Sequence, residues 1–177
     1  MIIIAWTGSR PPDGGFSIGE QNYVYRHTCS VIRAHGERLQ VLTGGCIGID
    51  DLVTHAAHEL CGVSTRAILP YRGISTTAWE TLRKCQTLLD YSEVGPTLRD
   101  KMIVEQASEV HAIGLLYPRR LPRSGTWATA RMAQRAGKLK DLIVLRPAVG
   151  ATPRKYEGAD WCLCNRDCAC GRPRLEN

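Results

Sequence analysis

The sequence predicts an α/β fold in which a parallel sheet carries helices on both of its faces. Two observations support this. Short apolar runs alternate along the chain with longer segments whose apolar residues recur every three or four positions. Glycine and proline residues separate most of these segments, as they do between strands and helices. Such alternation places consecutive strands parallel to one another and under helical layers.

Five short apolar runs are expected to be strands. Residues 2–7 (IIIAWT) are apolar throughout and end at Gly8, which is typical of a strand buried on both faces. The other four strands are expected at residues 39–43, 64–69, 110–116 and 142–145.

Five helices are expected between these strands, at residues 18–34, 49–60, 75–85, 98–108 and 125–136. The apolar residues of the second helix follow helical spacing, and Gly36 and Gly137 are stop signals after the first and last helices. Residues 86–96 fit neither pattern, and the regular pattern stops after Arg146.

Five strands suit a Rossmann-like three-layer domain over residues 1–146, followed by a basic, cysteine-rich tail over residues 147–177. If the strand order is 3-2-1-4-5, the order reverses between the first and fourth strands. Ligands of such sheets bind beyond the carboxyl ends of the strands at this reversal. We therefore expect the site in the loops at residues 8–15 and 117–126, with the loop after the second strand beside them.

The loop after the first strand begins with Gly8, Ser9 and Arg10. Glycine allows a close approach of backbone to ligand, serine offers a hydroxyl, and arginine offers a fork for phosphate.

The loop after the second strand runs directly into a helix and contains Gly44, Gly45, Cys46 and Gly48. Amides at a helix N-terminus favour anions. Asp50 and Asp51 follow, and each is expected either to cap that helix or to bind a sugar hydroxyl.

The loop before the last helix contains Ser124, Gly125, Thr126 and Trp127, which together offer amides, two hydroxyls and an indole for stacking on a base. Each loop alone is also explained as a tight connection, and Trp127 and Trp79 equally as core residues. Three such loops at one edge of a sheet predict a pocket for phosphate or a nucleotide.

Four segments carry a resemblance to a known family. TGSR follows the first strand, TGGCIGIDDLVTHAA the second, LRDKMIVEQASEV precedes the fourth, and SGTWATARMAQRAGK follows it. In order and spacing these segments resemble the SLOG superfamily over residues 1–146. It includes lysine decarboxylase-like phosphoribohydrolases, the DNA-processing protein DprA and nucleotide-binding proteins of the YpsA type, to which the match is closest. The resemblance implies a nucleotide or nucleotide-derived ligand and a homo-oligomer.

The resemblance to the phosphoribohydrolases breaks at one residue. Their loop after the fourth strand resembles PGGxGTxxE, whose glutamate helps to cleave the N-glycosidic bond, whereas Thr129 stands at that position here. Arg99 matches their catalytic arginine, although an exposed residue paired with Asp100 or Glu93 is the alternative. Cleavage of a glycosidic bond requires a carboxylate that stabilises the cationic transition state. The candidates are Asp50, Asp51, Glu80 and Asp100.

Three functions remain as hypotheses. The first is binding of a nucleotide or nucleotide-derived ligand, as a sensor, with no cofactor required by the main domain. The second is hydrolysis of nucleoside 5'-monophosphates, with Arg99, Asp50 and Asp51 as the catalytic candidates. The third is DprA-like binding of single-stranded nucleic acid, because GCIGID resembles the GxAxGID of DprA with one residue fewer.

The cysteines form two groups. Cys29, Cys46, Cys61 and Cys85 are scattered and are expected to be buried thiols in a reducing compartment. The tail contains Cys162, Cys164, Cys168 and Cys170, which fit either a structural zinc site or free or disulfide-paired thiols, with an iron–sulfur or redox role as a third reading. His55 and His58 also stand at metal-ligand spacing, but a third ligand is not evident, so a helix-face or core role is expected.

Composition and charge narrow the class of protein. The 177 residues are 44% hydrophobic and 23% charged, which excludes collagen-like and low-complexity chains. No apolar run approaches the roughly 20 residues of a membrane helix, and the apolar start lacks a basic leader. We therefore expect a cytoplasmic protein without a membrane partner.

The net charge of +6 is unevenly distributed. Residues 1–117 carry 10 basic and 12 acidic side chains, whereas residues 118–177 carry 13 basic and 5 acidic ones. A basic segment either meets phosphates or forms a solvated surface. Binding of single-stranded nucleic acid also needs aromatic platforms, which are few in this segment, so a nucleic-acid partner is the weaker expectation.

Overall fold

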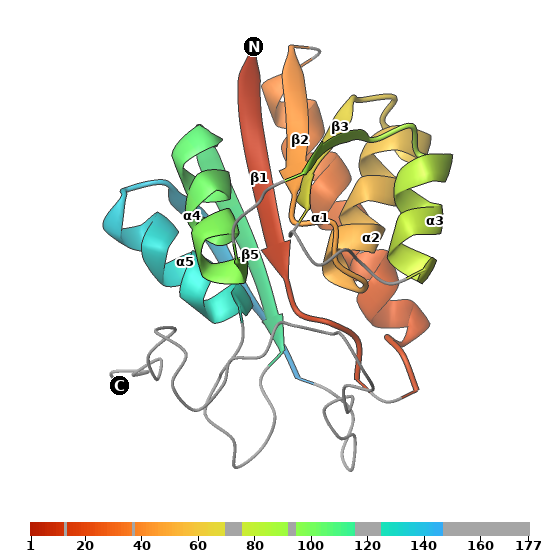
Figure 1. The fold of residues 1–177 in the computed structure, drawn as a ribbon. Coiled ribbons are helices and arrows are strands. Elements are labelled where there is room, and N and C mark those ends of the chain that lie inside the picture. Colours follow the sequence, from red (N-terminus) through yellow and green to blue (C-terminus); the bar gives the residue numbers. More distant parts are fainter. Residues whose placement is uncertain (13, 37, 70–75, 92–94, 116–124, 147–177) are drawn as a thin grey trace.

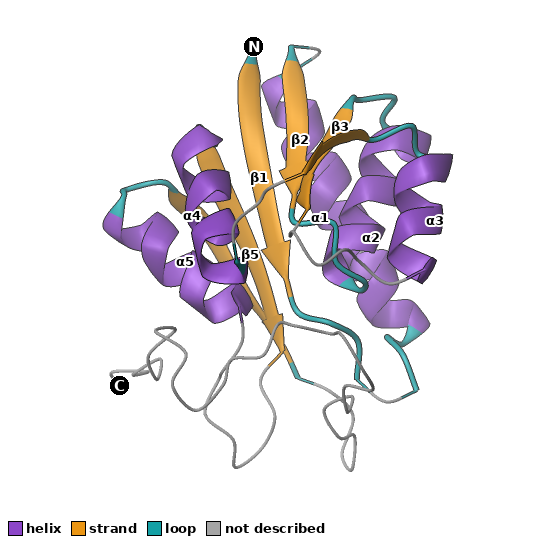
Figure 2. Ribbon diagram, viewed as in Figure 1, coloured by secondary structure: helices purple, strands orange, loops and turns teal. Residues whose placement is uncertain are grey.

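A six-stranded parallel sheet forms the centre of the computed structural model, with helices on both faces (Figure 1, Figure 2). The structure describes residues 1–12, 14–36, 38–69, 76–91, 95–115 and 125–146. The strands are β1 (Ile2–Gly8), β2 (Leu39–Thr43), β3 (Thr65–Leu69), β4 (Leu88–Tyr91), β5 (Glu109–Leu115) and β6 (Leu139–Leu145). The helices are α1 (Ile18–His35), α2 (Ile49–His55), the π-helical turn η1 (Ala56–Leu60), α3 (Thr76–Lys84), α4 (Pro96–Gln106) and α5 (Gly125–Arg135).

The strand order is β4-β3-β2-β1-β5-β6, and all described pairs are parallel. The predicted α/β class is confirmed, and the predicted order of five strands is preserved inside this sheet. The predicted number of strands is wrong, because β4 lies in the stretch that fitted neither pattern. This strand has four residues, a central Asp90 and an exposed Leu88, so it lacks the signal of a buried strand.

Side chains of the strands point alternately to the two faces of the sheet and pack in two separate hydrophobic cores. Ile4 and Trp6 of β1 face α1 and α2, where they pack with Val24 and Val53. Ala5 faces α4 and α5 and belongs to the second core. Side chains of neighbouring strand residues point to opposite faces of a sheet, so a central strand needs apolar residues at every position. This explains the unbroken run of residues 2–6.

The helix boundaries follow local chemistry. Ser17 caps α1, because its Oγ accepts the amide of Glu20 and the Glu20 carboxylate accepts the amide of Ser17 in return. The predicted helix over residues 49–60 divides into α2 and the π-helical turn η1. β6 begins at Leu139, three residues before the predicted start at residue 142. The prediction began too late because Lys140 and Asp141 are polar and lie in an edge strand, which lacks a continuous apolar run.

Among the described residues, no helix is long and apolar enough to cross a membrane.

Candidate functional site

A pocket lies at the carboxyl ends of β1, β2 and β5, at the edge of the sheet that faces down in Figure 1. The pocket is open to solvent, and the empty space in it and in front of it amounts to about 460 Å³. Strand order reverses between β1 and β5, so the pocket occupies the position where open α/β sheets bind ligands. Its lining residues are Thr7, Gly8, Ser9, Arg10, Gly44, Cys46, Asp50, Arg99, Asp100, Ile103, Gly125 and Thr126.

Most of the predicted site residues meet in this pocket. Six lie in the described part of the chain but do not line the pocket: Gly45, Gly48, Asp51, Trp79, Glu80 and Trp127. Ser124 and the tail cysteines Cys162, Cys164, Cys168 and Cys170 lie outside the described residues, as does Glu93. The zinc, nucleic-acid and homo-oligomer expectations stay predictions.

Aspartate side chains at the start of α2 bind the backbone amides of the loop between β2 and α2. The Oδ2 atom of Asp50 accepts hydrogen bonds from the amides of Gly44 and Cys46, at 3.1 and 3.2 Å. Asp51 Oδ2 accepts the amide of Gly48 at 3.1 Å. The amides of Gly44, Cys46 and Gly48 are thus bound by carboxylates of the chain itself, and Asp51 takes the capping role that the sequence allowed.

Burial makes the Asp50 carboxyl group a weaker acid than an exposed aspartate. Loss of solvent raises its pKa to about 6, and Asp100 adds to this, although Arg99 and the bonds from Gly44 and Cys46 act in the opposite direction. Its Oδ1 atom has no hydrogen-bond partner among the described residues. Burial also raises the pKa of Asp51, to about 7. Asp50 thus brings to the pocket a carboxyl group that exchanges a proton near neutral pH.

Arg99 is buried on α4, with 5% of its surface exposed. Its Nε and Nη2 atoms donate to Asp100 Oδ1 at 3.0 and 2.6 Å, and Nη1 donates to the carbonyl of Gly44 at 3.1 Å. Nη1 also lies 3.5 Å from the Cys46 sulfur. The alternative of an exposed arginine is wrong, while the pairing with Asp100 is present. The guanidinium ties α4 to the loop after β2.

Thr129 faces the same ion pair from α5. Its hydroxyl donates to the carbonyl of Gly125 at 2.8 Å. Burial raises the pKa of Asp100, while the charge of Arg99 and its hydrogen bonds to this carboxylate act in the opposite direction. The position of the phosphoribohydrolase glutamate thus holds a hydroxyl that is bound to the backbone of its own helix. Asp100 and Asp50 are the carboxyl groups that line the pocket.

The loop after β1 is fixed by close packing. A Cβ atom on Gly8 would lie 2.0 Å from the Cβ of Ile49, so only glycine fits here without a shift of α2. The carbonyl of Ser9 accepts the amide of Ile49 at 3.2 Å. The hydroxyl of Ser9 accepts the amide of Leu115 at 2.9 Å. Ser9 therefore joins the ends of β1 and β5 at the floor of the site.

The predicted residues that miss the pocket have packing roles. Gly45 packs against Leu69, and Gly48 lies over the backbone of Ser9 with a φ of +109°. Trp127 is 4% exposed and packs on Gly114, so the core interpretation holds for it. Trp79 is 40% exposed on α3 and does not line the pocket.

The histidines and cysteines form contacts that no sequence spacing indicated. His55 lies with Glu59 and Cys85 in a group whose possible metal-binding atoms are within 4.8 Å of one another, while His58 pairs with Glu59. Cys29 and Cys61 are separated by 3.2 Å between their sulfur atoms. The expected burial holds for Cys29 and Cys85, whereas Cys46 and Cys61 are half-buried.

No protein-family model and no curated protein matches the chain. Several solved structures share its fold. TM1055, a structural-genomics target, is 18% identical with a TM-score of 0.57, over 78% of this chain and 72% of that one. Two structures of the molybdenum cofactor carrier protein of Chlamydomonas reinhardtii are 21% and 23% identical, with TM-scores of 0.56 and 0.57. Each covers 81% of this chain, against 78% and 77% of the carrier. The chain therefore shares their Rossmann-like α/β fold.

Proposed function

We propose that the chain binds a nucleotide or nucleotide-derived small molecule in the pocket at the strand ends. The observation that carries the proposal is the composition of this pocket at the reversal of strand order. It combines the first turn of α5 with a buried guanidinium and two buried carboxyl groups. A concave site with a few convergent polar groups is the usual form of a small-molecule site.

The phosphate of this ligand is assigned to the start of α5. The first amides of a helix have no partner within that helix, and the helix dipole favours an anion there. Gly125 and Thr126 line the pocket at this end, and Thr126 adds a hydroxyl. The amides after β2 are poor candidates, because Asp50 already accepts hydrogen bonds from two of them.

The sugar or base end of the ligand is assigned to Asp50. Asp50 lines the pocket, and a carboxyl group can accept a hydrogen bond from a ribose hydroxyl or donate one when protonated. The molybdenum cofactor carrier has the same fold, so that cofactor belongs in the panel of ligands beside the nucleotides.

The test is a thermal-shift screen of the full chain, followed by calorimetric titration of any ligand that stabilises it. The panel contains nucleoside mono-, di- and triphosphates, NAD, the molybdenum cofactor and inorganic phosphate. Thr126→Val removes the pocket hydroxyl and should weaken binding about tenfold, the equivalent of one hydrogen bond to a charged group. Thr54→Val is the matched control, because Thr54 is a fully buried helical threonine outside the pocket.

Stabilisation by one class of nucleotide, weakened in Thr126→Val and unchanged in Thr54→Val, is the expected result. If no member of the panel stabilises the protein, or if both variants bind equally to wild type, the proposal fails.

A second function, hydrolysis of the N-glycosidic bond of nucleoside 5'-monophosphates, is favoured by one observation. Asp50 and Asp100 both line the pocket beside Arg99, and burial raises the pKa of each carboxyl. Glycoside hydrolysis uses a carboxylic acid to protonate the leaving group and a carboxylate to stabilise or attack the sugar cation. Water would add to C1' of the ribose as the base leaves with a proton, giving free base and ribose 5-phosphate.

Chromatography of nucleotide incubated with the protein tests this second function. Release of free base that is lost in both Asp50→Asn and Asp100→Asn is expected from a hydrolase. Release that persists in both variants rules out these two carboxyl groups as the catalytic pair, and no release from any nucleotide leaves binding as the function. Thermal unfolding of each variant checks that a loss of turnover is not a loss of fold.

A further inference from the structure

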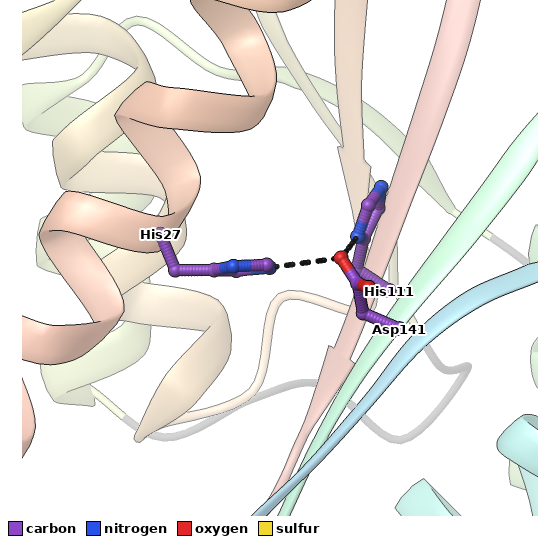
Figure 3. A group of neighbouring side chains, drawn as sticks. All are labelled: His27, His111 and Asp141. Carbon is purple, nitrogen blue, oxygen red and sulfur yellow. Dashed lines mark hydrogen bonds and ion pairs between the residues drawn. The ribbon is translucent and has the colours of Figure 1, made fainter.

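A second cluster of polar side chains lies under α1, away from the pocket. His27 comes from α1, His111 from β5 and Asp141 from β6, and the three side chains point toward one another between helix and sheet (Figure 3). His111 and Asp141 lie near the amino ends of their strands, whereas the pocket lies at the carboxyl ends. We propose that these three residues bind a divalent transition-metal ion, with zinc as the best match.

The distances suit a single ion. Asp141 Oδ2 lies 2.8 Å from His111 Nδ1 and 3.6 Å from His27 Nε2. All three atoms lie within 4.8 Å of one another. Zinc bonds of about 2.0–2.2 Å place tetrahedral ligand atoms roughly 3.3–3.6 Å apart. Small side-chain rotations would therefore centre an ion between them.

The hydrogen bonds of His111 place its Nδ1 atom against Asp141 and its Nε2 atom against Glu109. Its Nε2 atom lies 3.4 Å from Oε1 of the buried Glu109, an oxygen that also lies 2.6 Å from His35 Nε2. In the tautomer that carries its proton on Nε2 and donates it to Glu109, the lone pair of Nδ1 faces the Asp141 carboxylate. Two lone pairs facing each other at 2.8 Å repel unless a proton or a cation lies between them. A carboxylate behind a ligating histidine is the usual support of a zinc site.

His27 supplies an independent observation. Its Nε2 atom is buried and has no hydrogen-bond partner among the described residues, although it points toward Asp141. Buried polar atoms are nearly always hydrogen-bonded. The Nε2 atom of His27 lies near two other metal-binding groups without such a bond, so we expect a binding partner there. A metal ion would be that partner.

Aromatic neighbours hold both imidazole rings in place. Trp6 stacks on His111 with ring centres 5.0 Å apart, and Tyr23 stacks on His27 at 6.5 Å. Asp141 is the accessible member, with 44% of its side chain exposed. Two histidines and one carboxylate leave at least one coordination position for water, which is the ligand count of a reactive zinc site rather than a closed structural one.

The ligand set also suggests why zinc fits best. Calcium and magnesium prefer oxygen ligands only, whereas imidazole nitrogen suits zinc and its first-row neighbours. The same two-histidine, one-carboxylate set also holds Fe²⁺ in oxygenases, so Co²⁺, whose bound spectrum is visible, is a useful probe for the whole class.

The experiment is a zinc titration of metal-free full-length protein by calorimetry. The four tail cysteines are changed to serine in all samples, so that zinc on the tail does not enter the count. His27→Gln and Asp141→Asn each remove one ligand, and both residues are half-buried, so folding should survive. His55→Gln is the matched control, because His55 belongs to the other group of potential ligands. Thermal unfolding without metal verifies the fold of each variant.

One equivalent of zinc, bound about a hundredfold or more weaker in His27→Gln and Asp141→Asn but unchanged in His55→Gln, is the expected result. Bound Co²⁺ should show visible absorption bands that the same two variants lose. The proposal is wrong if the protein binds no zinc, or if His27→Gln and Asp141→Asn bind it as tightly as their parent. Loss of the zinc in His55→Gln alone would also overturn it.

Discussion

The Asp50 carboxylate accepts the amide of Gly44 at 3.1 Å, so the loop after β2 closes around an anion that belongs to the chain itself. This relationship changes how the site works. A phosphate cannot use the same amide without displacing a buried aspartate, which is why we propose that the phosphate of a ligand binds at the start of α5. The carboxyl group that remains beside the pocket titrates in the range where nucleotides also change charge, because burial raises its pKa to about 6.

The first prediction concerns stability against pH. The pKa of Asp50 is about 6 in the folded protein and 3.8 in the unfolded chain, so the native state binds more protons between these values. The free energy of unfolding contributed by this group therefore falls as pH rises from about 4 to 7, by up to about 3 kcal/mol. Urea unfolding at several pH values measures it.

Asp50→Asn is the comparison that isolates this effect, because the histidines also titrate in this range. Relative to wild type, the variant should gain stability as pH rises from 4 to 7. Parallel curves for the two proteins would mean that Asp50 is ionised at all these pH values, contrary to the burial seen here.

The second prediction concerns Gly8. Its added Cβ would lie 2.0 Å from the Cβ of Ile49, so Gly8→Ala must push α2 away from β1. We expect a loss of about 3 kcal/mol or more in the free energy of unfolding. Gly19→Ala is the control, because Gly19 is exposed in α1. A Cβ atom added there would lie 4.0 Å from the hydroxyl oxygen of Ser17 and would contact nothing closer. That variant should be unchanged or up to about 1 kcal/mol more stable. Equal effects of the two substitutions would refute the packing.

A third prediction concerns Cys29 and Cys61, whose sulfur atoms lie 3.2 Å apart. Burial raises the pKa of Cys61 to about 11, and the neighbouring Cys29 adds to this. The thiolate is the reactive form, so a disulfide should form slowly at pH 7 under a mild oxidant and faster as pH rises. Mass spectrometry of alkylated peptides would detect a Cys29–Cys61 bridge. Pairing of either cysteine with Cys85 instead would contradict the arrangement.

A fourth prediction follows from the proposed metal site. Glu109 contacts His111 on the side away from the metal, so it is a positioning residue. Glu109→Gln should weaken zinc binding about 10- to 100-fold while leaving one equivalent bound, which distinguishes it from loss of a ligand. Lys140→Gln is the control, since Lys140 lies 4.0 Å from Glu109 and is exposed. An unchanged affinity in Glu109→Gln would remove Glu109 from the site.

Much of the fold could be predicted because strong local patterns specify it. The unbroken apolar run of β1 and the helical spacing of α2 both reflect burial, and the glycines mark the ends of elements. β4 was missed because an edge strand buries little and its sequence alternates weakly. The start of α5 and the loop after β2 line the same pocket, as predicted, because parallel strands end at one edge of the sheet.

The site chemistry was less predictable, because it depends on which partner each polar group finds. The sequence allowed Asp50 to bind a ligand or to cap a helix, whereas in the folded loop its carboxylate accepts the amides of Gly44 and Cys46, which precede α2. Arg99 could be exposed or buried, and its burial depends on Gly44, which is 55 positions away. The cluster of His27, His111 and Asp141 has no local signature, since its members come from three elements.

The most direct test of the account is a nucleotide titration followed by backbone amide NMR. Shifts concentrated at Gly8, Gly44, Gly125 and Thr126, saturating with ligand and weakened in Thr126→Val, are the predicted result. Shifts that are absent at saturating nucleotide, or that gather around His27 and Asp141 instead, would contradict the assignment of the ligand to the strand-end pocket.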